Sequence, residues 1–156
     1  MRNLFLLLSS FIFLPLFSFG QLSVDGAVAY STSNENLGVQ VRGMYRLNDQ
    51  LRPSINFTYY IDGAGSTTIT EFNAHRQYLG VRKEQFNIYG LVGINAFRVK
   101  IQDSTDTDRI NDIGLDVGGG IDFKLSDKLS GLVEAKYDFS ENVNQWVISL
   151  GVLRTF

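Results

Sequence analysis

His75 is the only histidine of the chain, and Glu71 stands four residues before it. A serine, a histidine and an acid can together hydrolyse or transfer an acyl group, so these two side chains are the first candidates for chemistry. No serine motif typical of such an enzyme stands near them. We therefore expect His75 to be structural, with catalysis by it as the alternative.

A second candidate is the acidic segment 102–112, which carries Asp103, Asp106, Asp108 and Asp112. Carboxylate oxygens are the ligands that Ca²⁺ prefers. The segment lacks the glycine and the final glutamate of an EF-hand loop. We expect a solvated loop rather than a metal site, and the sequence indicates no other cofactor.

The largest charged group occupies every second position of otherwise apolar segments. It comprises Arg42, Arg46, Asp116, Asp122, Lys124, Glu134, Lys136 and Asp138. Side chains two residues apart in a β-strand point to the same side, so these charges would share one face. Charges gathered away from water are very costly unless they pair. We expect an internal ion-pair network, in which Glu134 and Lys136 pair; the alternative is a narrow, selective pore.

Alternation with period two dominates the chain after residue 20 and predicts β-strands. The predicted strands are 22–30, 37–47, 53–62, 69–82, 86–97, 113–124, 129–139 and 146–156. The segment 69–82 changes phase: Phe72 and Ala74 are apolar-facing in its first half, Leu79 and Val81 in its second. A β-bulge, or an upper half that stands clear of a membrane, would explain this change.

The connections between these segments alternate in character. Tight polar turns are expected at 48–50, 83–85 and 126–128, and longer polar loops at 31–36, 63–68, 100–111 and 140–144. Strands of about ten residues joined in this way are typical of an all-β, up-and-down meander.

The first twenty residues predict a secretory signal peptide. Arg2 precedes an apolar run at 4–17, and the small residues Ser18 and Gly20 favour cleavage after Gly20. The run is too short for a comfortable membrane-spanning helix, which needs about 20 residues. We divide the chain into a signal peptide, 1–20, and one barrel domain, 21–156.

Composition narrows the function classes. The chain has 14 Lys and Arg against 16 Asp and Glu, so no basic excess points to nucleic acid. It has no cysteine, so no disulfide stabilises the exported domain. Its 15 glycines, two prolines and 13% aromatic residues suit an all-β protein.

Alternation alone does not tell which face is inside, because a soluble barrel with an apolar ligand cavity has the same pattern. The predicted polar face mixes charges with small residues such as Ala27, Gly118 and Gly151, which suits a narrow filled interior. Aromatic residues gather at both strand ends, as in the interfacial belts of membrane barrels. They are Tyr30, Tyr59, Phe97, Phe139 and Trp146 toward the long loops, and Tyr45, Phe86, Phe123 and Phe156 toward the short turns.

The last segment, WVISLGVLRTF, is similar to the C-terminal signature of outer-membrane barrels, and the chain resembles the small OmpA/OmpX-type family. The resemblance implies an all-β, eight-stranded antiparallel up-and-down transmembrane β-barrel in a Gram-negative outer membrane. It implies outer-membrane lipids, lipopolysaccharide, periplasmic chaperones and the barrel-assembly machinery as partners. The implied assembly signal is Trp146, Leu150, Gly151, Val152 and Phe156. Arg154 departs from the family, which often has an aromatic residue there.

We expect a non-enzymatic envelope protein, with a structural role or a surface interaction through its loops, whose ligand the sequence does not identify. Some barrels of this size modify lipid A, so a lipid-A-modifying enzyme is the alternative. A narrow pore and a soluble ligand-carrying barrel are less favoured.

Overall fold

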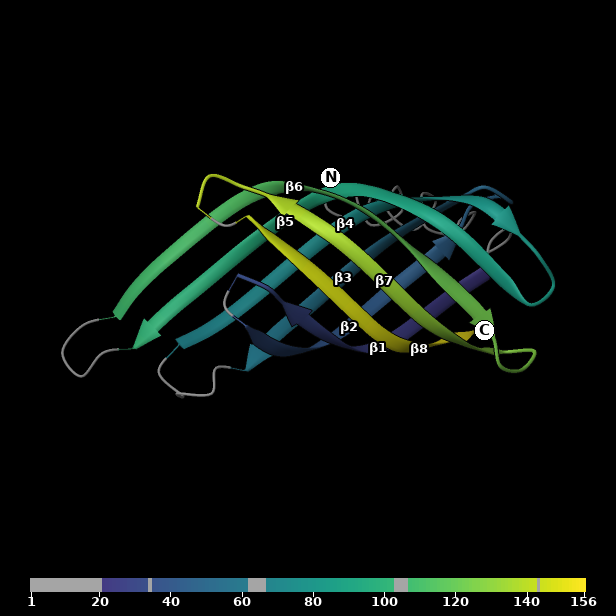
Figure 1. Ribbon diagram of the computed structural model, residues 1–156, viewed down its shortest axis with the longest axis horizontal. Helices are drawn as coiled ribbons and strands as arrows, with labels where there is room; N and C mark the ends of the chain where they lie inside the picture. Colours follow the sequence, from purple (N-terminus) through teal and green to yellow (C-terminus); the bar gives the residue numbers. More distant parts are fainter. Residues whose placement is uncertain (1–20, 34, 62–66, 103–106, 143) are drawn as a thin grey trace, which may run out of the picture.

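The computed structural model describes residues 21–33, 35–61, 67–102, 107–142 and 144–156. The segments in which apolar and polar residues alternate form eight antiparallel strands. They are β1 (Gln21–Ser31), β2 (Asn36–Arg46), β3 (Leu51–Ile61), β4 (Thr67–Arg82), β5 (Phe86–Gln102), β6 (Thr107–Lys124), β7 (Leu129–Phe139) and β8 (Gln145–Thr155). Each strand pairs with the next and β8 pairs with β1, which closes the barrel. Figure 1 shows the strands crossing the long axis of the molecule obliquely. The predicted fold is confirmed.

The described residues contain no helix long and apolar enough to cross a membrane. Residues 1–20 lie outside the described part of the chain. The signal peptide and its cleavage after Gly20 therefore stay predictions.

The strands turn their apolar residues outward and their polar residues inward. On β2 the exposed fraction is 61% for Val41 and 0% for Arg42, and on β6 it is 76% for Ile113 and 1% for Asp116. A water-soluble barrel has the opposite arrangement, with apolar side chains in its interior. The observed faces are those of a barrel surrounded by lipid, and they argue against a soluble ligand carrier.

Two strands, β5 and β6, are much longer than the sequence pattern predicted. Five strands have 11 residues, whereas β4 has 16, β5 has 17 and β6 has 18. The predicted loop 100–111 was wrong, because β5 and β6 stay paired up to Gln102 and Thr107. Polar residues mark the end of the membrane-spanning part of a strand, but they do not end the hydrogen-bonded pairing of the two strands, because backbone pairing can continue in water. In Figure 1 the β5–β6 hairpin consequently reaches furthest at one end of the barrel.

A β-bulge explains the phase change on β4. The register with β5 shifts between Leu79 and Val81, around Gly80. Leu79 faces inward at 2% exposure, whereas Val81 is 41% exposed. Of the two predicted explanations the bulge is confirmed, and the placement of Leu79 on the outer face with Val81 was wrong.

The aromatic residues at the strand ends face outward with one clear exception. Trp146, Phe139 and Tyr59 are exposed near the long-loop end, and Phe123 and Phe156 near the short-turn end. The exception is Phe97, which is 4% exposed and packs on the inner face, so its predicted place in the belt was wrong. The period of two from Asn95, which also faces inward, carries Phe97 to the same side.

Candidate functional site in the barrel lumen

Six of the eight predicted lumen charges are buried on the inner faces. They are Arg42, Asp116, Asp122, Glu134, Lys136 and Asp138, none more than 2% exposed. Arg46 lies half-buried at the short-turn mouth of the barrel. Lys124 is placed outside the network: its Nζ contacts Asp127 Oδ1 at 2.9 Å in the exposed turn after β6. The hydrogen bond and charge of Lys124 lower the pKa of the Asp127 carboxyl.

The half of the lumen nearer the short turns holds what we call the arginine cluster: Asp25, Arg42, Arg52, Asp122 and Glu134. Arg42 Nη1 contacts Glu134 Oε2 at 2.5 Å, and its Nε lies 3.0 Å from Asp25 Oδ2. Arg52 Nη1 contacts Asp122 Oδ2 at 2.6 Å. Two guanidinium groups thus neutralise carboxylates from three other strands.

Neutral groups complete the arginine cluster. Arg52 Nε donates to Gln77 Oε1 at 2.6 Å, and its guanidinium lies 4.9 Å from the centre of the Tyr89 ring. The Tyr89 hydroxyl donates to Glu134 Oε2 at 2.7 Å. Tyr89 therefore connects the Arg52 and Arg42 ion pairs, and the five charges act as one network.

The half nearer the long loops holds the lysine cluster: Glu71, His75, Asp116, Lys136 and Asp138. Lys136 Nζ forms an ion pair with Glu71, contacts Asp138 Oδ1 at 2.7 Å and lies 3.6 Å from Asp116 Oδ2. His75 Nε2 lies 2.6 Å from the same Asp116 oxygen. One ammonium group therefore faces three carboxylates.

Hydrogen bonds extend the lysine cluster toward the barrel end. The Tyr60 hydroxyl donates to Glu71 Oε2 at 2.7 Å, and Gln145 Nε2 donates to Asp138 Oδ2 at 3.2 Å. Ser31 in turn donates to Gln145 Oε1. Above these groups Tyr60 packs with Ala29, Ile69 and Val147 in an apolar layer.

A glycine makes room for the contact between His75 and Asp116. A Cβ atom at Gly93 would collide with the backbone oxygen of Ala74 and with the His75 and Asp116 side chains. Small inner residues are thus needed where long charged side chains cross the lumen, as the sequence pattern predicted.

The pairing of Glu134 with Lys136 was wrong. Both side chains point inward from β7, but Glu134 belongs to the arginine cluster and Lys136 to the lysine cluster. Residues two apart on a tilted strand lie at different depths of the barrel and meet different partners across it. Sequence reasoning also missed Asp25, Arg52, Glu71 and His75 as members. Asp25 and Glu71 stand on the polar side of the alternation, and this position was the signal that could have included them.

His75 does not lie at the lipid-facing surface. It is 4% exposed, and its register partner on β3 is Ser54, itself 4% exposed. Ser54, His75 and Asp116 together have the residue types of an acyl-transfer triad. No hydrogen bond joins Ser54 to His75 in the described part of the chain, and all three side chains are enclosed.

The acidic segment gives no metal site among the described residues, where no group of three or more His, Cys, Asp or Glu side chains could hold an ion. Asp103 and Asp106, together with the side chain of Asp108, lie outside the described part. Asp112 accepts a hydrogen bond from the Asn142 backbone N–H at 3.0 Å. It therefore ties β6 to the segment that follows β7.

The C-terminal segment faces outward in the pattern expected from its sequence. Trp146, Leu150, Val152 and Phe156 are exposed on the outer wall, and Gly151 packs inward beside Ala27. The Phe156 N–H donates to Leu22 O at 3.0 Å, at the seam where β8 meets β1. Arg154 lies over the Phe156 ring, 5.2 Å from its centre.

Comparison with known proteins identifies one family and several solved structures of the same fold. Residues 16–156 match the family model described as the outer membrane protein beta-barrel domain. No curated protein matches the chain. The N-terminal barrel of OprF from Pseudomonas aeruginosa is similar, with a TM-score of 0.69 and 14% identity over 88% of this chain and 98% of that one. Neisserial surface protein A has a TM-score of 0.69 and 17% identity over 88% of this chain and 96% of its own. Ail of Yersinia pestis has a TM-score of 0.66 and 14% identity over 88% of this chain and 97% of its own.

Proposed function

This chain belongs to the outer membrane protein beta-barrel domain family, and we propose that it is a non-enzymatic envelope protein with a closed lumen. Membership of this family implies that the protein is located in the outer membrane of a Gram-negative bacterium. In the proposal, the two ion-pair clusters hold the barrel shut and the protein acts through its outer surface and long-loop end.

The observation that carries the proposal is the complete burial of the lumen charges. Arg42, Arg52 and Lys136 cross the interior and are at most 2% exposed. The cavity beside Tyr60 and Gln145, at the long-loop end, has a volume of only about 10 Å³. Such a space holds about one water molecule. An eight-stranded barrel is just wide enough for its side chains, which supports a plug over a pore.

The enclosure of His75 supports a non-enzymatic role. A lipid-modifying enzyme needs its nucleophile and base where a lipid can reach them, and Ser54, His75 and Asp116 lie inside the wall. The contact between His75 Nε2 and Asp116 Oδ2 also links the histidine to Lys136, which gives it a structural role in the lysine cluster.

Assembly and surface interaction complete the proposal. The outward row Trp146, Leu150, Val152 and Phe156 is available to the barrel-assembly machinery and, before folding, to periplasmic chaperones. The long β5–β6 hairpin offers paired backbone beyond the other strands for a surface contact. One structural neighbour, Ail, is named as an attachment invasion locus protein, which supports a surface role for a barrel of this shape.

Conductance in planar lipid bilayers tests the closed lumen. The refolded protein should show no steady conductance. The double variant Arg42→Ser with Glu134→Ser removes two large lumen side chains together and should conduct measurably, which shows that the assay can detect an opened barrel. Steady, ion-selective conductance by the unaltered protein would overturn the plug and make it a pore.

Lipid analysis tests the non-enzymatic role. Cells producing the protein, its His75→Ala variant or its Ser54→Ala variant should contain the same lipid A species. A lipid species that depends on the protein and disappears with either substitution, at equal barrel levels, would show an enzyme instead.

A further inference from the structure

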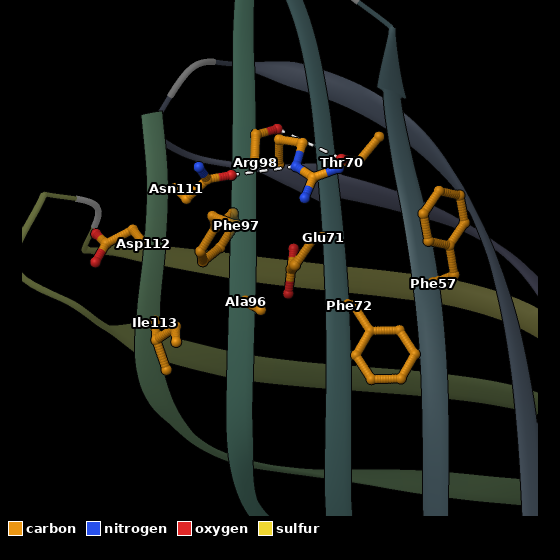
Figure 2. Close-up of a pocket in the computed structure, with 10 residues that line it drawn as sticks. All are labelled: Phe57, Thr70, Glu71, Phe72, Ala96, Phe97, Arg98, Asn111, Asp112 and Ile113. Atoms are coloured by element: carbon orange, nitrogen blue, oxygen red, sulfur yellow. Dashed lines mark hydrogen bonds between the residues drawn. The ribbon is translucent and has the colours of Figure 1, made fainter. Parts of the chain in front are cut away.

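The outer wall carries a groove near its long-loop end, across β3 to β6. Its sides and floor are one row of register partners: Phe57, Phe72, Ala96 and Ile113. The short side chain of Ala96 lies between Phe72 and Ile113, as Figure 2 shows. The groove has a volume of about 410 Å³. We call it the wall groove; its size and apolar sides suit part of an acyl chain.

Cationic and amide groups form the rim of the wall groove on the side of the strand ends. Arg98 Nε donates to Asn111 Oδ1 at 3.1 Å, which holds the guanidinium group beside the groove (Figure 2). Lys100, the next outward residue of β5, is exposed. In the described part of the chain neither Arg98 nor Lys100 forms an ion pair. Arg98 thus lines the hollow and Lys100 follows it on the same face, and neither cation has a carboxylate partner among the side chains that the structure describes.

The charge of the outer wall favours an anionic ligand. Among outward-facing strand residues whose side chains are described, the charged ones are all basic: Arg76, Arg98, Lys100 and Arg154. Glu71 and Asp112 also border the wall groove, but from the inner face. Glu71 is 0% exposed and its carboxylate points into the lumen, where it pairs with Lys136 rather than with a group on the outer wall.

We propose that the wall groove binds a molecule of lipopolysaccharide, with an acyl chain of its lipid A over Ala96 and a phosphate at Arg98 and Lys100. Short turns of such barrels are periplasmic, so the groove lies at the level of the outer leaflet. The forked donors of arginine match phosphate geometry, and lysine adds a second positive charge. The proposal rests on the membrane placement of the barrel and not on a closed lumen, so the conductance test does not decide it.

Native mass spectrometry of the refolded barrel in detergent tests the site. The probes are diphosphoryl lipid A, the same lipid without its phosphates, and phosphatidylcholine. We expect one diphosphoryl lipid A to be retained, with a preference of roughly tenfold over the dephosphorylated form, the effect of one charge-assisted contact. Arg98→Gln should reduce the preference, and Arg98→Gln combined with Lys100→Gln should abolish it. Ala96→Leu, which fills the groove, should weaken retention of both lipid A forms.

Arg76→Gln is the matched control, since Arg76 also faces outward from β4 but is the register partner of Pro53 near the start of β3, toward the short turns. It should keep the full preference. Heat-dependent gel mobility confirms that each variant is folded. Equal retention of the two lipid A forms by the unaltered barrel, or an unchanged preference in Arg98→Gln, would show bulk lipid contact and overturn the proposal.

Discussion

Val41 and Arg42 are neighbours on β2, yet Val41 is 61% exposed on the outer wall while Arg42 is completely buried between two carboxylates. The same contrast holds along the other strands. An outward apolar residue needs only to be apolar, because lipid chains accommodate many shapes. An inward charge needs particular partners at particular depths, because an unpaired charge in the lumen is very costly. The outer face thus specifies where the barrel resides, and the inner face specifies how it packs.

The largest effect should come from the inner residue on which most partners depend. Lys136→Met leaves Glu71, Asp116 and Asp138 without their shared cation, and should destabilise the refolded barrel by about 3–5 kcal/mol. The urea midpoint in lipid or detergent measures this. Lys124→Met is the matched control and should change stability by less than about 0.5 kcal/mol, since its partner Asp127 is exposed. Equal effects of the two substitutions would contradict the lysine cluster.

On the outer face a charge should matter and a change of apolar shape should not. Val41→Arg places a charge about midway along β2 on the lipid side, and should cost about 2–4 kcal/mol. Val41→Leu should stay within about 0.5 kcal/mol of the unaltered protein. Denaturation from lipid vesicles gives both values. If arginine is tolerated as well as leucine, this face does not contact lipid.

Deletion of Phe156 separates stability from assembly. Phe156 is 64% exposed on the outer wall, so the contact of its ring with lipid should be worth at most about 1.5–3 kcal/mol. Loss of Phe156 should reduce the amount of protein in the outer membrane of cells far more than such a loss of stability would explain. The comparison is between cellular levels and the urea midpoint of the refolded variant. Unchanged cellular insertion would show that the C-terminal resemblance carries no assembly signal.

The smallest effect should be the coupling within one inner pair. Arg52→Met and Asp122→Asn each leave a buried charge without its charged partner, whereas the double variant removes both charges. The coupling energy from a double-mutant cycle should be about 0.5–3 kcal/mol. Strictly additive effects would mean that Arg52 is held by Gln77 and Tyr89 alone.

The sequence was sufficient for the number and order of the strands, for most of their inward and outward faces and for most of the inner charges, because these follow from residue type and a period of two. It was insufficient for the partners. Lys136 and Glu71 are 65 positions apart, and His75 and Asp116 are 41 apart. Which of them meet depends on strand tilt and register around the closed barrel. Arg52 was missed for a local reason: Pro53 was taken as the strand start, although proline is tolerated near the first residue of a strand.

The orientation of the two faces is the central claim, and lipid-borne quenching tests it most directly. The chain has no cysteine, so single substitutions Val41→Cys and Ile148→Cys can carry a fluorescent probe attached before refolding into vesicles. Nitroxide on lipid acyl chains should quench both probes strongly, while aqueous iodide should not. A probe at Asp127→Cys, in the exposed turn, should show the reverse. Probes at Val41 and Ile148 that resist the lipid quencher in a folded barrel would contradict the outward placement of the apolar face.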